Sequence, residues 1–364
     1  MRADIAIIGA GIAGASLAAE VTGHASVLLI EAEAQPGYHS TGRSAAFWSE
    51  SYGGPLVQPL TTASYAFLAE GGYLSPRGAL HIADAEGKLA LDRLCAEFAG
   101  SDVTMERLGR PALERLVPGL AAGWDDGVLE SSCTDIDVAR LHAAYLKAAR
   151  AKGAVLLTDA RVERAERRHD HWALETGGGT LEARIVVNAA GAWADEVAGL
   201  AGLAAIGIQP HRRTIVQLRT DPPAPADLPL VIDALGRFYF KPEAGGRLWL
   251  SPHDETACAA SDCAPEEYDV ALAIDRFSRV VDWRVQRVEH KWAGLRSFAP
   301  DRLPVYGFDG RAEGFFWCAG QGGFGIQTAP AAAKLAAALL LGTTPDPLVA
   351  AIDPTPYLAG RFTN

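Results

Sequence analysis

Cysteine is scarce in this sequence, with five residues, an odd number, in a chain of 364. None of them stands in a C-x-x-C pair, so we predict neither a zinc site nor a disulfide scaffold, and no bound metal. No stretch has the features of a signal peptide, because the chain enters an apolar strand at once. These absences favour a cytoplasmic protein with reduced thiols, and they leave a peripheral association with a membrane open.

Long apolar runs and net positive charge are lacking as well. The longest apolar stretch, residues 329–341, contains Lys334 and is too short to cross a bilayer, so we expect a buried helix and no transmembrane segment. A net charge of −11 argues against a nucleic-acid partner. The 49% of hydrophobic residues argues against disorder, and the length predicts two domains.

What the sequence does have begins near its N-terminus. Residues 4–8 are typical of a short buried strand, and the run 9–14, which contains the G-x-G-x-x-G pattern, opens an apolar helix over 12–21. A second strand, residues 26–30, ends at Glu31. A glycine fingerprint alone is a weak signal, but the strand before it, the helix after it and the acid downstream complete a dinucleotide-binding unit.

Each residue of this fingerprint has a physical role. Gly9 permits the tight turn, Gly11 lets the backbone approach a pyrophosphate, and Gly14 lets the helix lie close to the strand. The helix N-terminus offers free N–H groups and a positive dipole to phosphates. Glu31 can accept hydrogen bonds from a ribose diol. The alternative is a glycine-rich turn of purely structural use, which we consider the weaker interpretation.

Apolar periodicity predicts the remaining elements. The expected helices cover residues 59–70, 88–98, 138–152, 271–281 and 326–341. The expected strands cover 78–83, 155–157, 160–162, 171–176, 180–183, 185–193, 212–218, 238–242, 247–251 and 316–320, those from 212 to 251 forming a separate sheet. His81 is interpreted as an ordinary strand residue. The small-residue loop 34–46 is either an ordinary loop or backbone that approaches a ligand.

Two features of the last third suggest a binding site. Arg296 lies in an apolar stretch, and a mostly buried arginine needs an anion, supplied either by the protein or by a ligand. Residues 321–325 form a second glycine-rich junction between a strand and a helix, whose positive end could face a negatively charged cofactor. No catalytic triad, H-E-x-x-H, EF-hand or Walker motif is present, so the chemistry is expected to reside in the cofactor.

Separated segments of the chain resemble one family. The N-terminal fingerprint, residues 40–46, residues 187–193, and Gly294-Leu295-Arg296 with residues 300–304 resemble the FAD-dependent D-amino acid oxidase/dehydrogenase family, which includes glycine oxidase and sarcosine oxidase. Within the family, the runs 35–46, 292–298 and 321–328 are most similar to those of bacterial D-arginine dehydrogenases.

The resemblance implies a fold of α/β plus α+β type. A Rossmann-type FAD-binding domain, residues 1–77, 136–206 and 294–364, would be interleaved with a substrate-binding domain built on an antiparallel sheet, residues 78–135 and 207–293. The helix starting near Gly325 would face the pyrimidine end of the flavin. The FAD contacts implied are Gly9, Gly11, Ile12, Ala13, Gly14, Glu31, Ala32, Ser40, Thr41, Arg43, Ser44, Ala45, Ala46, Val162, Ala189, Gly191, Trp193, Gly320, Gly322, Gly323, Phe324, Gly325, Ile326 and Gln327.

The resemblance also implies a substrate site. Arg296 matches the arginine that clamps the substrate carboxylate, and Gly323 and Gln327 match positions near the substrate amine and the flavin. The other matching pocket residues are Tyr52, Tyr239 and one of Arg212 or Arg213, with Arg213 favoured.

Two departures concern specificity. Phe47 stands where the D-arginine enzymes have a pocket histidine, and Ala79 stands where they have the acid that reads a cationic side chain. A pocket lined by Phe47 and Ala79 would favour a neutral, apolar side chain. Another acid, such as Glu50, could replace the missing one.

The expected function is oxidative deamination of an amino acid of D configuration. A hydride would pass from Cα to flavin N5, and the imino acid would hydrolyse to a 2-oxo acid and ammonia. The alternatives are a sarcosine, proline or 2-hydroxy-acid oxidoreductase on the same fold, or a flavin-binding subunit of a larger complex. The electron acceptor, whether oxygen, a quinone or another carrier, is left open.

Overall fold

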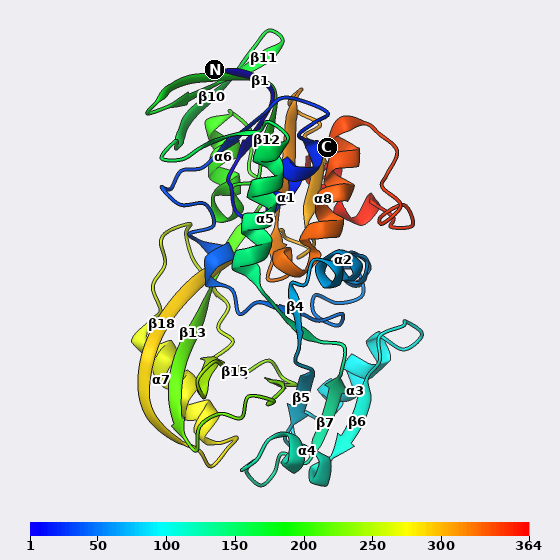
Figure 1. Cartoon of the computed structure of the whole chain (residues 1–364), viewed down its shortest axis with the longest axis vertical. Coiled ribbons are helices and arrows are strands. Elements are labelled where there is room, and N and C mark those ends of the chain that lie inside the picture. The colour runs from blue at the N-terminus through cyan, green and yellow to red at the C-terminus, as the bar shows by residue number, and fades with distance from the viewer. Residues whose placement is uncertain (364) are drawn as a thin grey trace.

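The N-terminal strand β1 (Arg2–Ile8) lies at the centre of a mixed eight-stranded sheet in the computed structural model, which describes residues 1–363 (Figure 1). It pairs in parallel with β2 (Val27–Ile30) on one side and β12 (Gly179–Asn188) on the other. The remaining strands are β9 (Val155–Leu157), β10 (Val162–Arg168), β11 (His171–Thr176), β19 (Val305–Phe308) and β20 (Phe315–Ala319). β1 and β2 are apolar throughout their buried length because helices or strands cover both faces.

The two faces of β1 belong to two separate hydrophobic clusters. Ile5 and Ile7 contact α1 (Ile12–Val21), α5 (Val138–Ala151) and α8 (Gly325–Leu341). Ala6 and Ile8 belong to the cluster that includes residues of α6 (Ala194–Leu200) and the aromatic residues of β20. The side-chain period of two along a strand thus places alternate residues in opposite layers. Most of the residues that α1 and α8 place against each other are alanines, which lets the two helices approach closely. The helix α2 (Gln58–Glu70) also contacts α8.

A second sheet of ten strands forms the other half of the chain (Figure 1). Its path runs through β21 (Gln321–Gly322), β18 (Arg284–Phe298), β13 (Gln209–Asp221), β16 (Arg247–Ser251), β15 (Tyr239–Glu243), β14 (Leu230–Asp233), β5 (Ala79–Ala83), β7 (Asp126–Glu130) and β6 (Glu106–Gly109), with β17 (Thr256–Ala257) beside β13. The helices α3 (Lys88–Glu97), α4 (Arg110–Leu116) and α7 (Glu267–Ser278) contact this sheet.

Short elements connect the two sheets. A three-stranded sheet is made of β3 (Phe47–Trp48), β8 (Thr134–Ile136) and β4 (Leu74–Pro76). The short helical turns are η1 (Ser40–Arg43), η2 (Gly191–Trp193), η3 (Thr355–Tyr357) and α9 (Gly360–Thr363). No helix among residues 1–363 is long and apolar enough to span a membrane.

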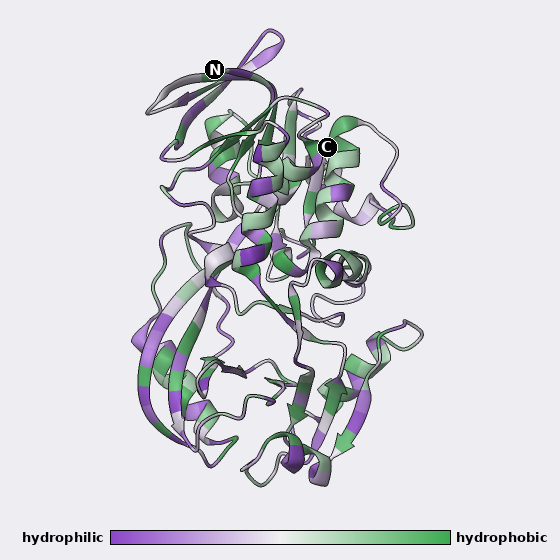
Figure 2. Ribbon diagram, viewed as in Figure 1, coloured by the Kyte–Doolittle hydropathy of each residue, from purple (hydrophilic) through white to green (hydrophobic). Residues whose placement is uncertain are grey.

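The predicted fold class is confirmed, and the expected helices are present with bounds that differ by a few residues. The main correction concerns β18, because no strand was predicted over residues 284–298. Residues 294–298, assigned from the sequence to the FAD-binding part, continue this strand of the second sheet. Charged residues interrupt β18 because one face is exposed, and Figure 2 shows hydrophilic and hydrophobic residues mixed along β13 and β18. The strands β6, β7 and β14 were missed as well.

The approach of α1 to β1 gives a stability prediction. A Cβ atom on Gly14 would lie 1.9 Å from the carbonyl oxygen of Gly9. Gly14→Ala should therefore lower the free energy of unfolding by about 1–3 kcal/mol, the usual cost of overpacking, as measured by chemical denaturation.

Gly199→Ala is the matched control, because Gly199 also lies in a helix but has no neighbouring atom within 4 Å of the position that a Cβ atom would occupy. This variant should be stabilised by about 0.5–1 kcal/mol. Equal responses of the two variants would contradict the packing argument.

Candidate active site

A cavity of about 270 Å³ runs between the N-termini of α1 and α8. Most residues that the resemblance assigned to FAD line it. These are Gly9, Gly11, Ile12, Ala13, Glu31, Ala32, Ser40, Thr41, Arg43, Ser44, Ala45, Ala46, Val162, Ala189, Gly191, Trp193, Gly322, Gly323, Gly325, Ile326 and Gln327. Gly14, Gly320 and Phe324 from the same set do not line the cavity: Gly14 lies beneath Gly9, and Phe324 is buried against Val57 and Phe298.

The turn after β1 is built for close approach of backbone. Gly9 has a φ of +101°, and a Cβ atom there would lie 2.4 Å from the carbonyl oxygen of Ala189. Only glycine combines this conformation with this contact. A Cβ atom on Gly11 would meet a single atom within 4 Å, Oγ1 of Thr41 at 3.2 Å. The open side of Gly11 is the cavity, where a phosphate group could reach the helix N-terminus.

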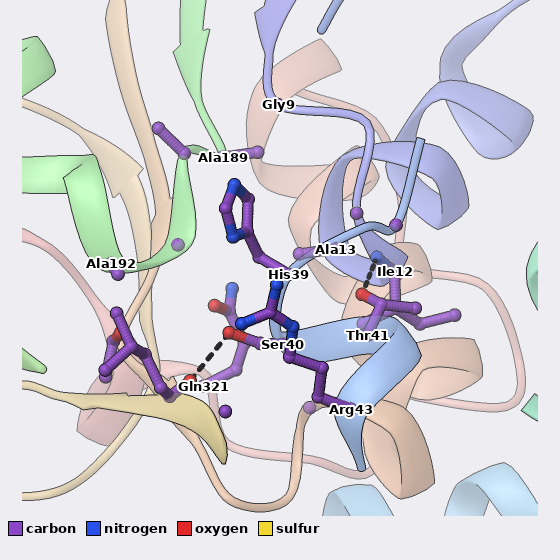
Figure 3. A pocket seen from close by; sticks show the side chains of 18 of the residues that line it. Gly9, Ile12, Ala13, His39, Ser40, Thr41, Arg43, Ala189, Ala192 and Gln321 are labelled. Atoms are coloured by element: carbon purple, nitrogen blue, oxygen red, sulfur yellow. Dashed lines mark hydrogen bonds between the residues drawn. The ribbon is translucent and has the colours of Figure 1, made fainter. Parts of the chain in front are cut away.

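Side chains from distant segments hold the N-terminus of α1. The backbone N–H of Ile12 donates to Oγ1 of Thr41 at 3.0 Å (Figure 3). The buried carboxylate of Glu31 accepts from the N–H of Ala10 at 2.9 Å and from that of Glu33 at 3.0 Å. These bonds fix the glycine turn and place the carboxylate of Glu31 at the end of β2, where it could accept hydrogen bonds from the hydroxyl groups of a ribose. The glycine cradle, the helix end and the acid all fit an FAD molecule.

The other end of the cavity is formed at Gly323, just before α8. A Cβ atom on this residue would lie 2.0 Å from Nη2 of Arg296 and 2.0 Å from Oη of Tyr52. The guanidinium and the phenol therefore converge on bare backbone, from β18 and from the loop that follows β3.

Arg296 is a buried cation with an unused hydrogen-bonding fork. Its side chain is 13% exposed, and its nearest acid is Glu255, with Nη1 and Oε2 3.6 Å apart. It donates no hydrogen bond to any residue of the described range 1–363, and it lies against the rings of Tyr52 and Phe298. Burial, and then the charge of Arg302, lowers the pKa of Arg296 to about 9, which leaves the guanidinium charged at neutral pH. Such a group favours a bound anion.

Arg213 is the second arginine at this end. In the pairing of β13 with β18, Arg213 lies opposite Gly294 and His211 lies opposite Arg296, so both arginines occupy the same face of the sheet. Nε of Arg213 donates to the carbonyl oxygen of Asp254 at 2.7 Å, and Nη2 lies 3.5 Å from Glu255.

Arg212, the alternative to Arg213, points to the opposite face. It pairs with Glu266 and with Asp269, and it does not line the cavity. This follows from the alternation of side chains along a strand. Tyr239 lines a neighbouring cavity, with the guanidinium of Arg213 5.9 Å from its ring.

The two residues expected to determine specificity lie in different places. Phe47 lines the cavity, with its ring 5.2 Å from that of Tyr52. Ala79 is fully buried against Ala45 and Ile215 and lines neither cavity, so its expected contact with the substrate is not seen.

Glu50 and Gln327 are both occupied by the protein itself. The carboxylate of Glu50 accepts from Thr62 at 2.8 Å and from Ser132 at 3.1 Å, and it lines neither cavity. It therefore does not replace the missing acid. The amide of Gln327 accepts from the N–H of Ser49 and donates to the carbonyl oxygen of Tyr52, so its side chain holds the loop that carries Tyr52.

Several lining residues were not predicted. His39 lies in the cavity (Figure 3), with its ring 4.5 Å from that of Trp193 and Nε2 3.0 Å from Glu33. Glu255, which lies between Arg213 and Arg296 but does not line the cavity, was not predicted either. His39 lies in the small-residue loop 34–46, for which contact with a ligand was one of the two interpretations. No local pattern marks Glu255, because pairing over long sequence distances brings it to Arg213 and Arg296. Arg43, which was predicted, donates to the carbonyl oxygens of Cys263 and Ala293 and so joins the cavity wall to β18.

The chain is similar to proteins of one family. The family model described as FAD dependent oxidoreductase matches residues 4–339. Glycine oxidase from Geobacillus kaustophilus is 27% identical over 359 residues, which is 93% of each protein. The hydrogen cyanide synthase subunit HcnC from Pseudomonas aeruginosa is 29% identical over 287 residues, or 77% of this chain and 66% of that protein, slightly less than two thirds of its length. The crystal structure of the Geobacillus glycine oxidase superimposes with a TM-score of 0.84 at 24% identity, over 98% of both chains.

Glu31 gives a prediction for cofactor binding. In Glu31→Gln, one of the two backbone N–H groups would face an amide donor instead of an oxygen, a loss of about 1–3 kcal/mol for a buried donor. The FAD retained per chain after dialysis should fall well below that of the wild type, as measured by absorbance.

Glu20→Gln serves as control, because Glu20 lies on α1 and its carboxylate is 3.4 Å from Lys334, away from the cavity. It should retain FAD like the wild type. Full retention in Glu31→Gln would show that this carboxylate does not support the cofactor site.

Proposed function

This chain belongs to the FAD dependent oxidoreductase family, and we propose that it oxidises the Cα–N bond of a D-amino acid with a neutral side chain. FAD is its cofactor and oxidoreduction its type of reaction. The products would be a 2-oxo acid and ammonia, formed when the imino acid is hydrolysed by water. The configuration of the substrate, its neutral side chain and the roles of single residues are parts of this proposal.

The buried guanidinium of Arg296 is the observation that carries the proposal. It lies beside Gly323 at the wall of the cofactor cavity, and within residues 1–363 it has no hydrogen-bond acceptor of its own. A carboxylate would supply two oxygens to the fork and compensate the buried charge. Nothing about this arrangement requires a side-chain nucleophile or a metal.

The residues of the chain would act mainly by orientation. FAD, when bound, supplies the oxidising power by accepting the two electrons of the substrate as a hydride. Arg296 would hold the carboxylate, and Tyr52, whose ring is 5.5 Å from the guanidinium, would close one side of the substrate. Gly323 has no side chain, which lets Arg296 and Tyr52 lie against the backbone before α8 and so fixes where the carboxylate would bind.

Charge at the site favours neutral side chains. Arg213 and Arg296 are both buried here, and their shared acid, Glu255, also pairs with Arg302. A cationic side chain would therefore meet two positive charges and an acid that is already engaged. Phe47 adds apolar surface at the same place.

A second candidate function is that of a flavin-binding subunit. It is favoured by the similarity to HcnC, whose name describes a subunit of hydrogen cyanide synthase. Gel filtration combined with activity measurements on the pure chain separates the two candidates. A single chain that turns over amino acids would favour the self-sufficient enzyme.

The role of Arg296 can be tested by Arg296→Lys. Lysine keeps the charge but loses the planar fork, so kcat/KM for the best amino acid should fall about a hundredfold while FAD content is retained. Arg212→Lys, one residue from Arg213 but outside the cavity, is the control and should keep near-normal kinetics. Normal kcat/KM in Arg296→Lys would rule out the carboxylate clamp.

Substrate preference is tested with D- and L-enantiomers of Leu, Met, Phe, Arg and Lys and a dye acceptor, with and without oxygen. We expect the neutral D-amino acids to exceed D-Arg and D-Lys by about tenfold or more in kcat/KM. A preference for D-Arg or D-Lys would overturn the argument from charge. The L series decides the configuration, and the comparison with and without oxygen identifies the acceptor class.

Substitution of Ala79 by an acid is not expected to shift the substrate preference towards cationic side chains. The site is fully buried and lines no cavity, so the carboxylate introduced by Ala79→Glu would destabilise the fold.

A further inference from the structure

A second cavity, of about 370 Å³, adjoins the first one. The two share Phe47, Tyr52 and Arg213, so the second cavity begins where the cofactor cavity ends. Its other walls come from β5, β14, α3 and the loop after β16. The lining residues that the argument uses are His81, Leu94, Ile232, Tyr239 and His253.

His81, on β5, is the unusual residue of this cavity. Its Nε2 is buried and has no hydrogen-bond partner within residues 1–363. Burial lowers the pKa of His81 to about 4, so the ring is neutral at neutral pH. The ring as a whole is partly exposed and lines the cavity, and its other nitrogen, Nδ1, makes no hydrogen bond within residues 1–363, so Nδ1 is the atom that a ligand in the cavity can reach.

Other buried polar groups nearby are satisfied by the protein. Glu130 accepts from Ser49 at 2.9 Å and from the N–H of Glu50 at 2.6 Å. Asp233 accepts from Nε of Arg237 at 2.7 Å. The unpaired state of His81 is therefore not a general property of this region.

His253 adds a second neutral imidazole. Its Nδ1 lies 2.8 Å from the carbonyl oxygen of Gly236, which can only accept, so Nδ1 carries the proton and Nε2 is an acceptor. Burial, and then the charge of Arg213, lowers the pKa of His253 to about 3. The ring lies edge-on to Tyr239, with centroids 5.4 Å apart.

We propose that this second cavity is the side-chain subsite of the substrate and that it takes an aromatic ring bearing an N–H or O–H group, an indole or a phenol, which pairs with His81. The proposal rests on the proposed function, because it places the side chain of the same amino acid. Leu94, Ile232 and Tyr239 would contact the ring, and the imidazoles would engage its polar group.

Two observations favour this ligand over the other neutral side chains. An aliphatic side chain, or the ring of phenylalanine, would bury His81 further without giving it a partner. The cavity also exceeds what a leucine or methionine side chain would fill. Two acids line the cavity: Asp233 is engaged by Arg237, and Glu97 is exposed and lies on α3 one turn from Arg93, which also lines the cavity.

The test compares D-Trp with D-Phe, which differ in the N–H group and in ring size, and the variants of His81 separate the two contributions. Wild-type kcat/KM should favour D-Trp about tenfold or more, and in His81→Leu the ratio should fall to near one through selective loss of D-Trp. His81→Gln, which keeps an acceptor, should retain part of the preference. His290→Leu, an exposed histidine on β18 whose ring stacks on Trp292, is the control and should keep the wild-type ratio.

A binding experiment separates this proposal from the proposed function. Indole-3-acetate and phenylacetate are unreactive carboxylates, and calorimetry on the FAD-loaded protein should show that the indole binds about tenfold more tightly, with the difference lost in His81→Leu. If indole-3-acetate binds more tightly than phenylacetate but no amino acid is oxidised, the subsite proposal is supported and the proposed function is wrong. If wild type and His81→Leu discriminate equally, or if D-Leu is preferred to D-Trp, the subsite proposal is overturned.

Discussion

The site depends on a positive charge that the fold buries without giving it a hydrogen-bond acceptor within residues 1–363. Arg296 lies at the end of β18, held against aromatic rings, with its nearest carboxylate at 3.6 Å. Taking a guanidinium out of water is costly unless hydrogen bonds replace those to water. The register of β13 with β18 places Arg213 on the same face, which raises the positive potential and strengthens the demand for an anion.

The cofactor half follows from a different constraint, which is close approach of backbone. Gly9 and Gly14 let β1, α1 and the end of β12 meet at distances that no side chain allows. This opens the N-terminus of α1 towards the cavity, where Glu31 and Thr41 hold its first turn. The glycines before α8 act similarly at the other end, so that the N-terminus of α1 and the buried Arg296 share one cavity.

Much of this could be predicted from the sequence because its signals are local. The glycine fingerprint with its flanking strand and helix gave the first βαβ unit, and apolar periodicity gave α5 and α8 within about one residue of their bounds. Between Arg212 and Arg213, alternation along a strand decides which one faces the cavity, but only once the register is known.

The rest depends on pairing between distant segments. β18 was not predicted because the charged residues of its exposed face hide the apolar pattern of a strand. Glu255 was not predicted because a loop brings it to Arg213 and Arg296. His81 was interpreted as an ordinary strand residue, since a sequence does not show which buried groups lack a partner. The expected contact of Ala79 with the substrate was implied by the resemblance, and the structure shows Ala79 buried in a cluster with Ala45 and Ile215 and lining neither cavity.

The most direct measurement is a titration of the FAD-loaded protein with benzoate, an unreactive carboxylate, followed by flavin absorbance. The account predicts a saturable spectral change in the wild type and a dissociation constant about a hundredfold or more higher in Arg296→Leu, because the buried fork is lost. An equal dissociation constant in both proteins, at equal FAD content, would contradict it.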